Sequence, residues 1–164
     1  MKPFTHSLLL AFITLLFACG NKQITGNKEQ SDSQAKPAHV AEEAIPFTQA
    51  KNYFVRNDYR DSVTHLLKLE SRDAFDRVFG MASTMSPDGK PTPINFDTHY
   101  VLACISKSND KSIELQVASL VSNEGSILLT CSSKEGPAQT FISRSALILM
   151  VEKHHQGNPK LNLR

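Results

Sequence analysis

The feature that most constrains the fold is a series of short apolar segments, separated by polar turns, between residues 100 and 163. Tyr100–Ile105 is almost continuously apolar, which is typical of a strand covered on both faces. Apolar and polar residues alternate in Ser112–Val117, which indicates a half-buried strand. Because such segments recur about every 10–14 residues, with turns between them, we expect an antiparallel sheet or sandwich.

Other segments extend this β-rich pattern along the chain. Four further strands are expected in the same region: Ser126–Cys131, Gln139–Ile142, Ala146–Val151 and Leu161–Leu163. Turns rich in asparagine, glycine or proline are expected between strands at Asn109–Lys111, Asn123–Gly125 and Lys134–Pro137. Two earlier strands are expected at Asn52–Arg56 and Val63–Leu69. The strands after residue 100 are expected to form a β-meander.

One helix is predicted, over residues 72–79. Ser71 is a suitable N-cap, and Asp73 lies in the first turn, where the helix dipole favours an acidic side chain. Gly80 is expected to end the helix. The apolar face carries Phe75, Val78 and Phe79. The predicted fold class is therefore α+β, mainly β: an antiparallel sheet or sandwich with one short helix.

The N-terminus has the layout of a secretory signal peptide. Lys2 precedes an apolar run from Leu8 to Ala18, which is too short to span a bilayer as a helix. The sequence Leu-Phe-Ala-Cys-Gly at residues 16–20 resembles the lipobox of bacterial lipoproteins. The resemblance implies that residues 1–18 are a signal peptide and that Cys19 is acylated and becomes the mature N-terminus.

Residues 19–44 are expected to form a lipidated flexible tether. Polar residues dominate this segment, so it cannot bury enough apolar surface to offset the entropy lost on ordering. Residues 45–164 then form a single β-rich globular domain. Removal of residues 1–18 takes away one of the 18 basic residues and none of the 16 acidic ones. The resulting net charge of +1 does not favour a nucleic-acid partner.

Cys104 and Cys131 are the two cysteines after Cys19. An exported protein can keep disulfides, so their pairing must be considered. Their segments are expected to be next-nearest strands of one sheet, about 9.6 Å apart, which exceeds the roughly 7 Å limit for a disulfide. We therefore favour two buried free thiols, and pairing remains the alternative.

The sequence contains no recognisable catalytic motif, and we expect a protein that is not an enzyme and uses no cofactor. It lacks the Gly-x-Ser-x-Gly motif of serine hydrolases and any Cys-x-x-Cys pair. His154 and His155, with Glu152, form its densest group of potential metal ligands. Adjacent residues at a strand end point to opposite faces, so we expect solvated histidines and no metal site.

Two exposed segments are candidate binding surfaces. The first is a turn-forming loop stiffened by prolines, and it contributes Pro87, Asp88, Gly89, Lys90 and Pro91. A rigid loop loses little entropy on binding, which suits a partner-binding element. The alternative is a connector that merely positions the next strand. The second segment contributes Tyr59 and Arg60, residue types that recur at protein interfaces and on ordinary surfaces.

Five segments of the domain share a pattern of hydrophobic residues with a known family: Ser71–Phe75, Phe79–Gly80, Pro93–Phe96, Tyr100–Ala103 and Ala146–Val151. In these segments the domain resembles the PrcB-type protease-complex subunit family of small Bacteroidetes-type lipoproteins. The resemblance implies an accessory or inhibitory partner of secreted proteases. The Thr-Gly-Gly-Tyr type of loop found in many relatives is replaced here by Lys107–Lys111, so the resemblance supplies no binding residue.

The sequence thus predicts a lipid-anchored, non-catalytic protein-binding module of the bacterial cell envelope. It would sit on the outer membrane, facing either the periplasm or the cell surface, and its partner could be a protease. The alternative is a glycan-binding accessory lipoprotein. Sugar sites usually present aromatic platforms, and this chain has no tryptophan and three tyrosines.

Overall fold

The computed structural model describes residues 42–164. The predicted signal peptide, Cys19 and the tether up to residue 41 lie outside the described residues. The first strand begins at Glu43, two residues before the predicted start of the domain at Ile45. In the described part of the chain, no helix is long and apolar enough to cross a membrane.

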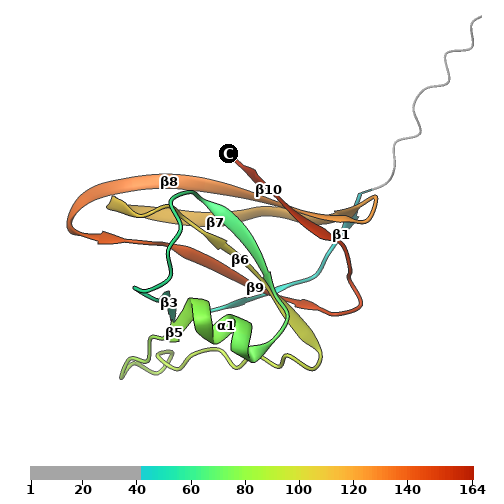
Figure 1. Cartoon of the computed structure of the whole chain (residues 1–164), viewed down its shortest axis with the longest axis horizontal. Coiled ribbons are helices and arrows are strands. Elements are labelled where there is room, and N and C mark those ends of the chain that lie inside the picture. Colours follow the sequence, from blue (N-terminus) through green and yellow to red (C-terminus); the bar gives the residue numbers. More distant parts are fainter. Residues whose placement is uncertain (1–41) are drawn as a thin grey trace, which may run out of the picture. The chain divides into compact units, whose positions relative to one another are not determined.

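The described residues form three layers (Figure 1). The first layer is a sheet with the order β1 (Glu43–Ala44), β7 (Asn109–Asn123), β8 (Ser126–Ser143) and β10 (Asn158–Leu163). The second is a sheet with the order β2 (Thr48–Ala50), β9 (Ala146–Glu152), β6 (His99–Ile105) and β4 (His65–Leu69). The third contains helix α1 (Arg72–Val78) and the pair β3 (Tyr53–Val55) and β5 (Phe79–Met81).

The predicted fold class is confirmed. Strands account for 56% of the structure, one short helix is present in the described chain, and the sheets are mostly antiparallel. The exception is β10, which pairs in parallel with β8, from Asn158 beside Ser126 to Leu163 beside Cys131.

Strand β6 lies in the middle layer and is buried on both faces, as its continuous apolar sequence predicts. Tyr100, Leu102 and Cys104 point toward the first sheet and join the core that it forms with β8 and β9. The alternate residues Val101, Ala103 and Ile105 belong to a second core beneath α1 and the β3–β5 pair. The alternation of one strand therefore connects two hydrophobic cores.

Helix α1 begins as predicted. The Ser71 hydroxyl accepts a hydrogen bond from the Ala74 amide at 3.2 Å, and Asp73 lies in the first turn. The predicted end is wrong: the helix stops at Val78, and Gly80 lies in β5 opposite Phe54. A Cβ atom at Gly80 would lie 2.4 Å from the Phe54 ring, so the glycine allows the ring to pack over the strand.

Phe75 is fully buried at the centre of an aromatic cluster. Its ring centroid lies 5.0 Å from that of Tyr53 in an edge-to-face arrangement. The Phe79 and Phe96 centroids lie 4.9 and 5.8 Å away, in tilted arrangements. These contacts join α1, β3, β5 and the segment before β6 into one core.

The predicted turns at 109–111 and 134–137 are wrong, because both segments lie within long strands. Asn109–Asn123 is one strand, and Ser126–Ser143 is another. Opposite Gly136 and Pro137, β7 contributes only Ser112, so the extra residue forms a β-bulge. The strands also do not form the predicted meander, since β6 pairs with β4 and β9 and not with β7.

Cys104 and Cys131 are buried free thiols, as predicted. The predicted reason is wrong, because they lie in β6 and β8, in different sheets, and face each other within one core. A hydrogen bond between the two sulfur atoms, together with burial, raises the pKa of the Cys104 thiol. Both thiols are therefore packed within the core and shielded from solvent.

Candidate functional site

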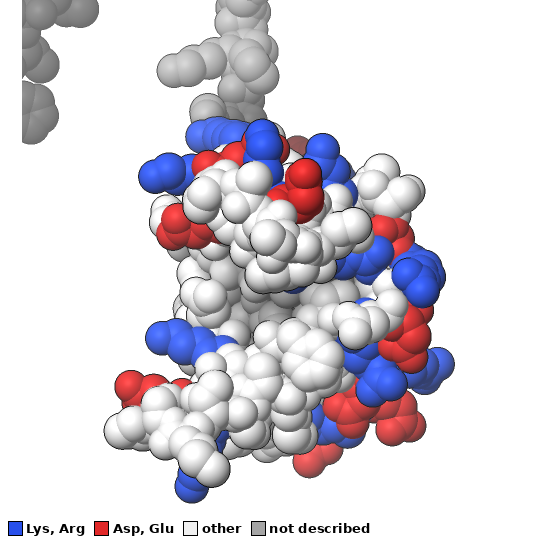
Figure 2. Space-filling view, turned by 90° about the vertical axis from the view of Figure 1, so that its left-hand side faces the viewer, with Lys and Arg blue, Asp and Glu red and all other residues white. Residues whose placement is uncertain are grey.

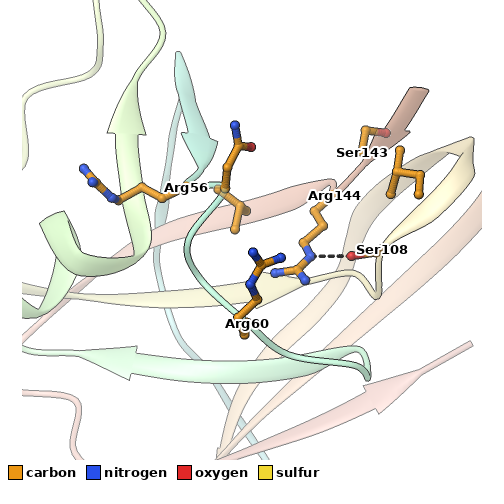
Figure 3. Close-up of a pocket in the computed structure, with 8 residues that line it drawn as sticks. Arg56, Arg60, Ser108, Ser143 and Arg144 are labelled. Carbon is orange, nitrogen blue, oxygen red and sulfur yellow. Dashed lines mark hydrogen bonds between the residues drawn. The ribbon is translucent and has the colours of Figure 1, made fainter. Parts of the chain in front are cut away.

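A pocket at one end of the domain brings Arg144 to Arg56 and Arg60, which lie in one segment far from it in the sequence (Figure 3). We call it the arginine pocket; its volume is about 490 Å³. It lies between the segment that follows β3, the β6–β7 connection and the turn from β8 to β9. Its lining residues are Val55, Arg56, Asn57, Arg60, Ser108, Ile142, Ser143 and Arg144.

Arg144 holds the walls of this pocket together. Its Nε donates to the Ser108 hydroxyl at 2.7 Å, the hydrogen bond drawn in Figure 3. Its two terminal nitrogens donate to the Tyr59 carbonyl at 2.6 Å and the Asp61 carbonyl at 3.1 Å. A guanidinium has five N–H donors, so two remain after these three bonds. Arg144 is thus fixed in place and still able to donate to a ligand.

Arg56 and Arg60 differ in their surroundings. Arg56 Nε lies 3.2 Å from Asp58 Oδ1, and this hydrogen-bonded guanidinium lowers the pKa of the Asp58 carboxyl. Arg60 has no ion-pair partner among the described residues. In Figure 3 the guanidinium groups of Arg60 and Arg144 both point into the pocket, whereas that of Arg56 points away. The pocket therefore presents two guanidinium groups without a bound carboxylate.

One wall of the arginine pocket is apolar and comes from a part of β8 with irregular strand pairing. Ala138 pairs with Lys111 and Ser143 pairs with Asn109, so residues 139–142 of β8 lie opposite Asp110 alone. This irregularity turns apolar side chains outward: Phe141 is 59% exposed and Ile142 is 74% exposed. Ile142 lines the pocket beside the cationic groups. The site thus combines positive charge with an exposed aliphatic surface.

The arginine pocket lies at the opposite end of the domain from β1. Strand β7 begins next to Ser108 and ends, 15 residues later, near the part that pairs with β1. At about 3.3 Å per residue this is roughly 45 Å along the strand. Figure 2 faces the end of the domain that is on the left in Figure 1, where the turn from β8 to β9 lies, and it shows that this face is hollowed.

The proline-containing loop does not contribute to the arginine pocket. Lys90 and Pro91 line a separate pocket of about 410 Å³ with Tyr53 and Met81, and the two pockets share no lining residue. The Asn52 side-chain amide donates to the carbonyls of Asp88 and Lys90, at 2.6 and 2.9 Å, and so ties the loop to the start of β3.

The turn at Pro87–Gly89 is confirmed. The Gly89 amide donates to the Ser86 carbonyl at 2.9 Å, and the Thr84 amide donates to the Gly89 carbonyl at the same distance. Gly89 is buried, and a Cβ atom there would lie 2.2 Å from the Thr84 carbonyl oxygen. Pro87 and Asp88 remain exposed. The loop is therefore held by hydrogen bonds to its own backbone and to Asn52, and its tip is exposed to solvent.

Of the second predicted pair, only Arg60 lines the arginine pocket. Tyr59 is half-buried, and its hydroxyl lies 2.8 Å from His65 Nε2. Burial, followed by the nearby charge of Asp61, raises the pKa of Tyr59. The Tyr59 carbonyl accepts a hydrogen bond from Arg144, so Tyr59 helps to position this arginine without lining the pocket itself.

Sequence reasoning missed Arg56 and Arg144. The chain offered one local signal for Arg144, its place between two serines where an exposed strand gives way to a strongly apolar one. A charged residue at such a junction indicates a turn, but it does not reveal which distant loop the side chain contacts.

The histidine pair is placed differently from the prediction. His154 and His155 follow the end of β9 in a turn, and their ring centroids lie 3.9 Å apart, so they do not point to opposite faces. His154 Nδ1 lies 3.1 Å from Glu152 Oε2. No group of three or more histidine, cysteine or acidic side chains in residues 42–164 is arranged to hold a metal ion.

Among residues 42–164, no strand pairs with the outer edge of β8 beyond the end of β10. Strand β10 pairs with β8 only as far as Cys131, and Ser133 then donates to the Arg164 carbonyl. The open edge that follows contains Pro137, which has no amide hydrogen, and the irregular residues 139–142. Prolines and bulges protect sheet edges from pairing with other chains, so this edge is poorly suited to accept an added strand.

Comparisons with known proteins found no family model, no curated protein and no solved structure that matches this chain.

Proposed function

We propose that this chain is a lipid-anchored, non-catalytic protein-binding module of the bacterial cell envelope and that the arginine pocket is its binding surface. The observation that carries the proposal is the pocket itself: it combines three arginines with the exposed side chain of Ile142. Arginine is enriched at protein interfaces, where its planar guanidinium donates several hydrogen bonds and its stem packs on apolar groups.

The position of the pocket supports this function. The described chain starts at β1, at the end of the domain remote from the pocket. If Cys19 is acylated, as the lipobox resemblance implies, the pocket lies on the far side of the domain from the segment that leads to the lipid. A partner could then reach it without contact with the membrane surface.

A protease or a subunit of a protease complex is the first partner class to test, on the resemblance to the PrcB-type family. Glycan binding has less support. Tyr100 is fully buried, and the hydroxyl groups of the half-buried Tyr53 and Tyr59 are bonded within the domain, to the Thr92 carbonyl and to His65. None of the three rings is placed as an open platform for a sugar.

The test is affinity capture from a detergent extract of the native envelope, with the full chain immobilised. Wild type, Arg60→Gln and Arg77→Gln are compared. Both substitutions remove one positive charge, but Arg77 lies on α1, outside the arginine pocket, where its Nε donates to the Asp73 carbonyl. We expect a protein partner that the wild type and Arg77→Gln retain in similar yield and that Arg60→Gln retains at no more than a tenth of that yield.

Capture of the same partner by all three chains would contradict a role for the pocket. Recovery of polysaccharide alone would favour the glycan-binding alternative. Circular dichroism of each variant checks that the fold is intact, which we expect because Arg60 and Arg77 are both exposed.

A further inference from the structure

The charges that line the arginine pocket define the chemistry of a ligand. All three charged lining residues are arginines, and no acidic residue lines the pocket. Two acidic side chains of the segment between β3 and β4 already have partners. Asp58 pairs with Arg56, and Asp61 accepts from the Val63 amide at 3.1 Å and lies 3.3 Å from His65 Nδ1. The charge of Arg60 also acts on Asp58 and that of Arg144 on Asp61, but neither arginine forms an ion pair with a described residue. An anionic group of a ligand would therefore offset the positive charge of the pocket.

The hydrogen-bond donors point to a carboxylate. Arg144 is held by three bonds and keeps two N–H groups free, and Arg60 lines the same pocket (Figure 3). A guanidinium and a carboxylate match in geometry and form two parallel charge-assisted hydrogen bonds. Because Arg144 is already fixed by the protein, little further side-chain entropy is lost when it binds a ligand.

The apolar wall points to a polypeptide ligand rather than a small inorganic anion. Val55 is buried beneath the pocket, and Ile142 is 74% exposed at its rim, next to the exposed Phe141. A free phosphate or sulfate would leave this surface in water. A peptide with an aliphatic residue beside its acidic one would cover it and gain the corresponding hydrophobic contribution.

We propose that the arginine pocket binds an acidic segment of a partner protein, in which an Asp or Glu side-chain carboxylate is held by Arg60 and Arg144 and a neighbouring aliphatic side chain contacts Ile142. This proposal rests on the proposed function and specifies the chemistry of the partner. The pocket volume, about 490 Å³, falls within the range of about 300–1,000 Å³ that is usual for ligand pockets.

The test uses the full chain in detergent micelles and short fluorescent peptides, with binding measured by fluorescence anisotropy at physiological salt. The probe has the core Leu-Glu-Leu-Glu and carries blocked termini. Its matched control has glutamine in place of each glutamate. A third peptide has the glutamine core and a free C-terminal carboxylate, and inorganic phosphate serves as a competitor.

We expect the blocked glutamate peptide to bind at least ten times more tightly than the glutamine control, a difference of about 1.4 kcal/mol. Arg60→Gln should weaken its binding at least tenfold, whereas Arg77→Gln, which removes the same charge elsewhere, should change it less than twofold. The Ile142→Ser variant should weaken binding of the glutamate peptide and leave weak competition by phosphate unchanged.

Four results would overturn the proposal. The first three are equal binding of the glutamate and glutamine peptides, equal effects of Arg60→Gln and Arg77→Gln, and no binding at millimolar peptide. The fourth is preference for the glutamine peptide with a free terminus, because the ligand would then be a chain end. If these results occur while affinity capture still yields an Arg60-dependent partner, the ligand chemistry is wrong and the proposed function stands. If affinity capture yields no partner that depends on Arg60, the proposed function itself is contradicted.

Discussion

Replacement of Phe75 by alanine is expected to lower the free energy of unfolding by about 3–5 kcal/mol, the usual cost of truncating a buried phenylalanine. Phe75 is completely buried, and its ring contacts those of Tyr53, Phe79 and Phe96. Truncation therefore removes apolar burial and three aromatic contacts, and it leaves a cavity where α1 meets β3 and β5. Since domains of this size are stable by only about 5–15 kcal/mol, a large part of the stability would be lost.

Urea denaturation followed by far-ultraviolet circular dichroism measures this effect, because the chain has no tryptophan to serve as a fluorescent probe. Phe141→Ala is the matched control: the same atoms are removed from a ring that is 59% exposed. We expect this control to stay within about 1 kcal/mol of the wild type. Similar losses for the two variants would show that the aromatic cluster is not the centre of the second core.

Arg144→Gln is expected to lower the free energy of unfolding by about 2–3 kcal/mol and to loosen the segment between β3 and β4. Hydrogen bonds from a charged donor contribute about 1.5–3 kcal/mol, and this guanidinium bonds Ser108 and the carbonyls of Tyr59 and Asp61. The expected loss of stability is smaller than the sum of the three hydrogen bonds, because the Arg144 side chain is only partly buried and solvent weakens each bond. Lysine cannot reproduce the fork of donors, so Arg144→Lys should resemble the glutamine variant.

Hydrogen exchange followed by mass spectrometry locates the change. Amide exchange in residues 57–64 should become faster in Arg144→Gln, while exchange in the buried strand β6 should change only as far as global stability does. Arg77→Gln, which removes an arginine from α1, should leave the exchange of residues 57–64 as it is in the wild type. Unchanged exchange of that segment in Arg144→Gln would mean that the arginine does not hold the wall of the pocket.

The elements that the sequence predicts well are those whose signal is local. Ser71 caps α1 through its own hydroxyl, and the helix begins where this residue indicates. The continuous apolar run of β6 predicts a strand buried on both faces, and its alternate residues do enter two cores. In β7 the alternation around Leu115 predicts the half-buried face that packs on the first core.

The elements that it predicts poorly depend on distant partners. Gly136 and Pro137 have the composition of a turn, but pairing with β7 on both sides absorbs them as a bulge. The sequence predicts Cys104 and Cys131 in one sheet, which is wrong because strand order cannot be read from spacing alone and the chain crosses between sheets. It predicts Gly80 at the end of α1, where the pairing of β5 with β3 imposes an extended backbone instead.

The candidate site is non-local for the same reason. Arg60 can be predicted as a candidate from the sequence, because it lies in a short charged and aromatic segment. Arg144 cannot, because it contacts the Tyr59 carbonyl across a separation of 85 residues. No spacing pattern joins two such positions. The contact arises because the turn from β8 to β9 lies against the segment that precedes β4, and this placement is a property of the sheet topology.

Site-specific photo-crosslinking in intact cells tests most directly whether the arginine pocket is a protein-binding surface. A photoreactive phenylalanine analogue replaces Ile142, at the rim of the pocket, or Phe47, which is 40% exposed near β1. We expect a crosslink to a defined polypeptide from position 142 that is absent from position 47 and is lost when Arg60→Gln is added. The same polypeptide crosslinked equally from both positions, or crosslinked from position 142 regardless of Arg60, would contradict it.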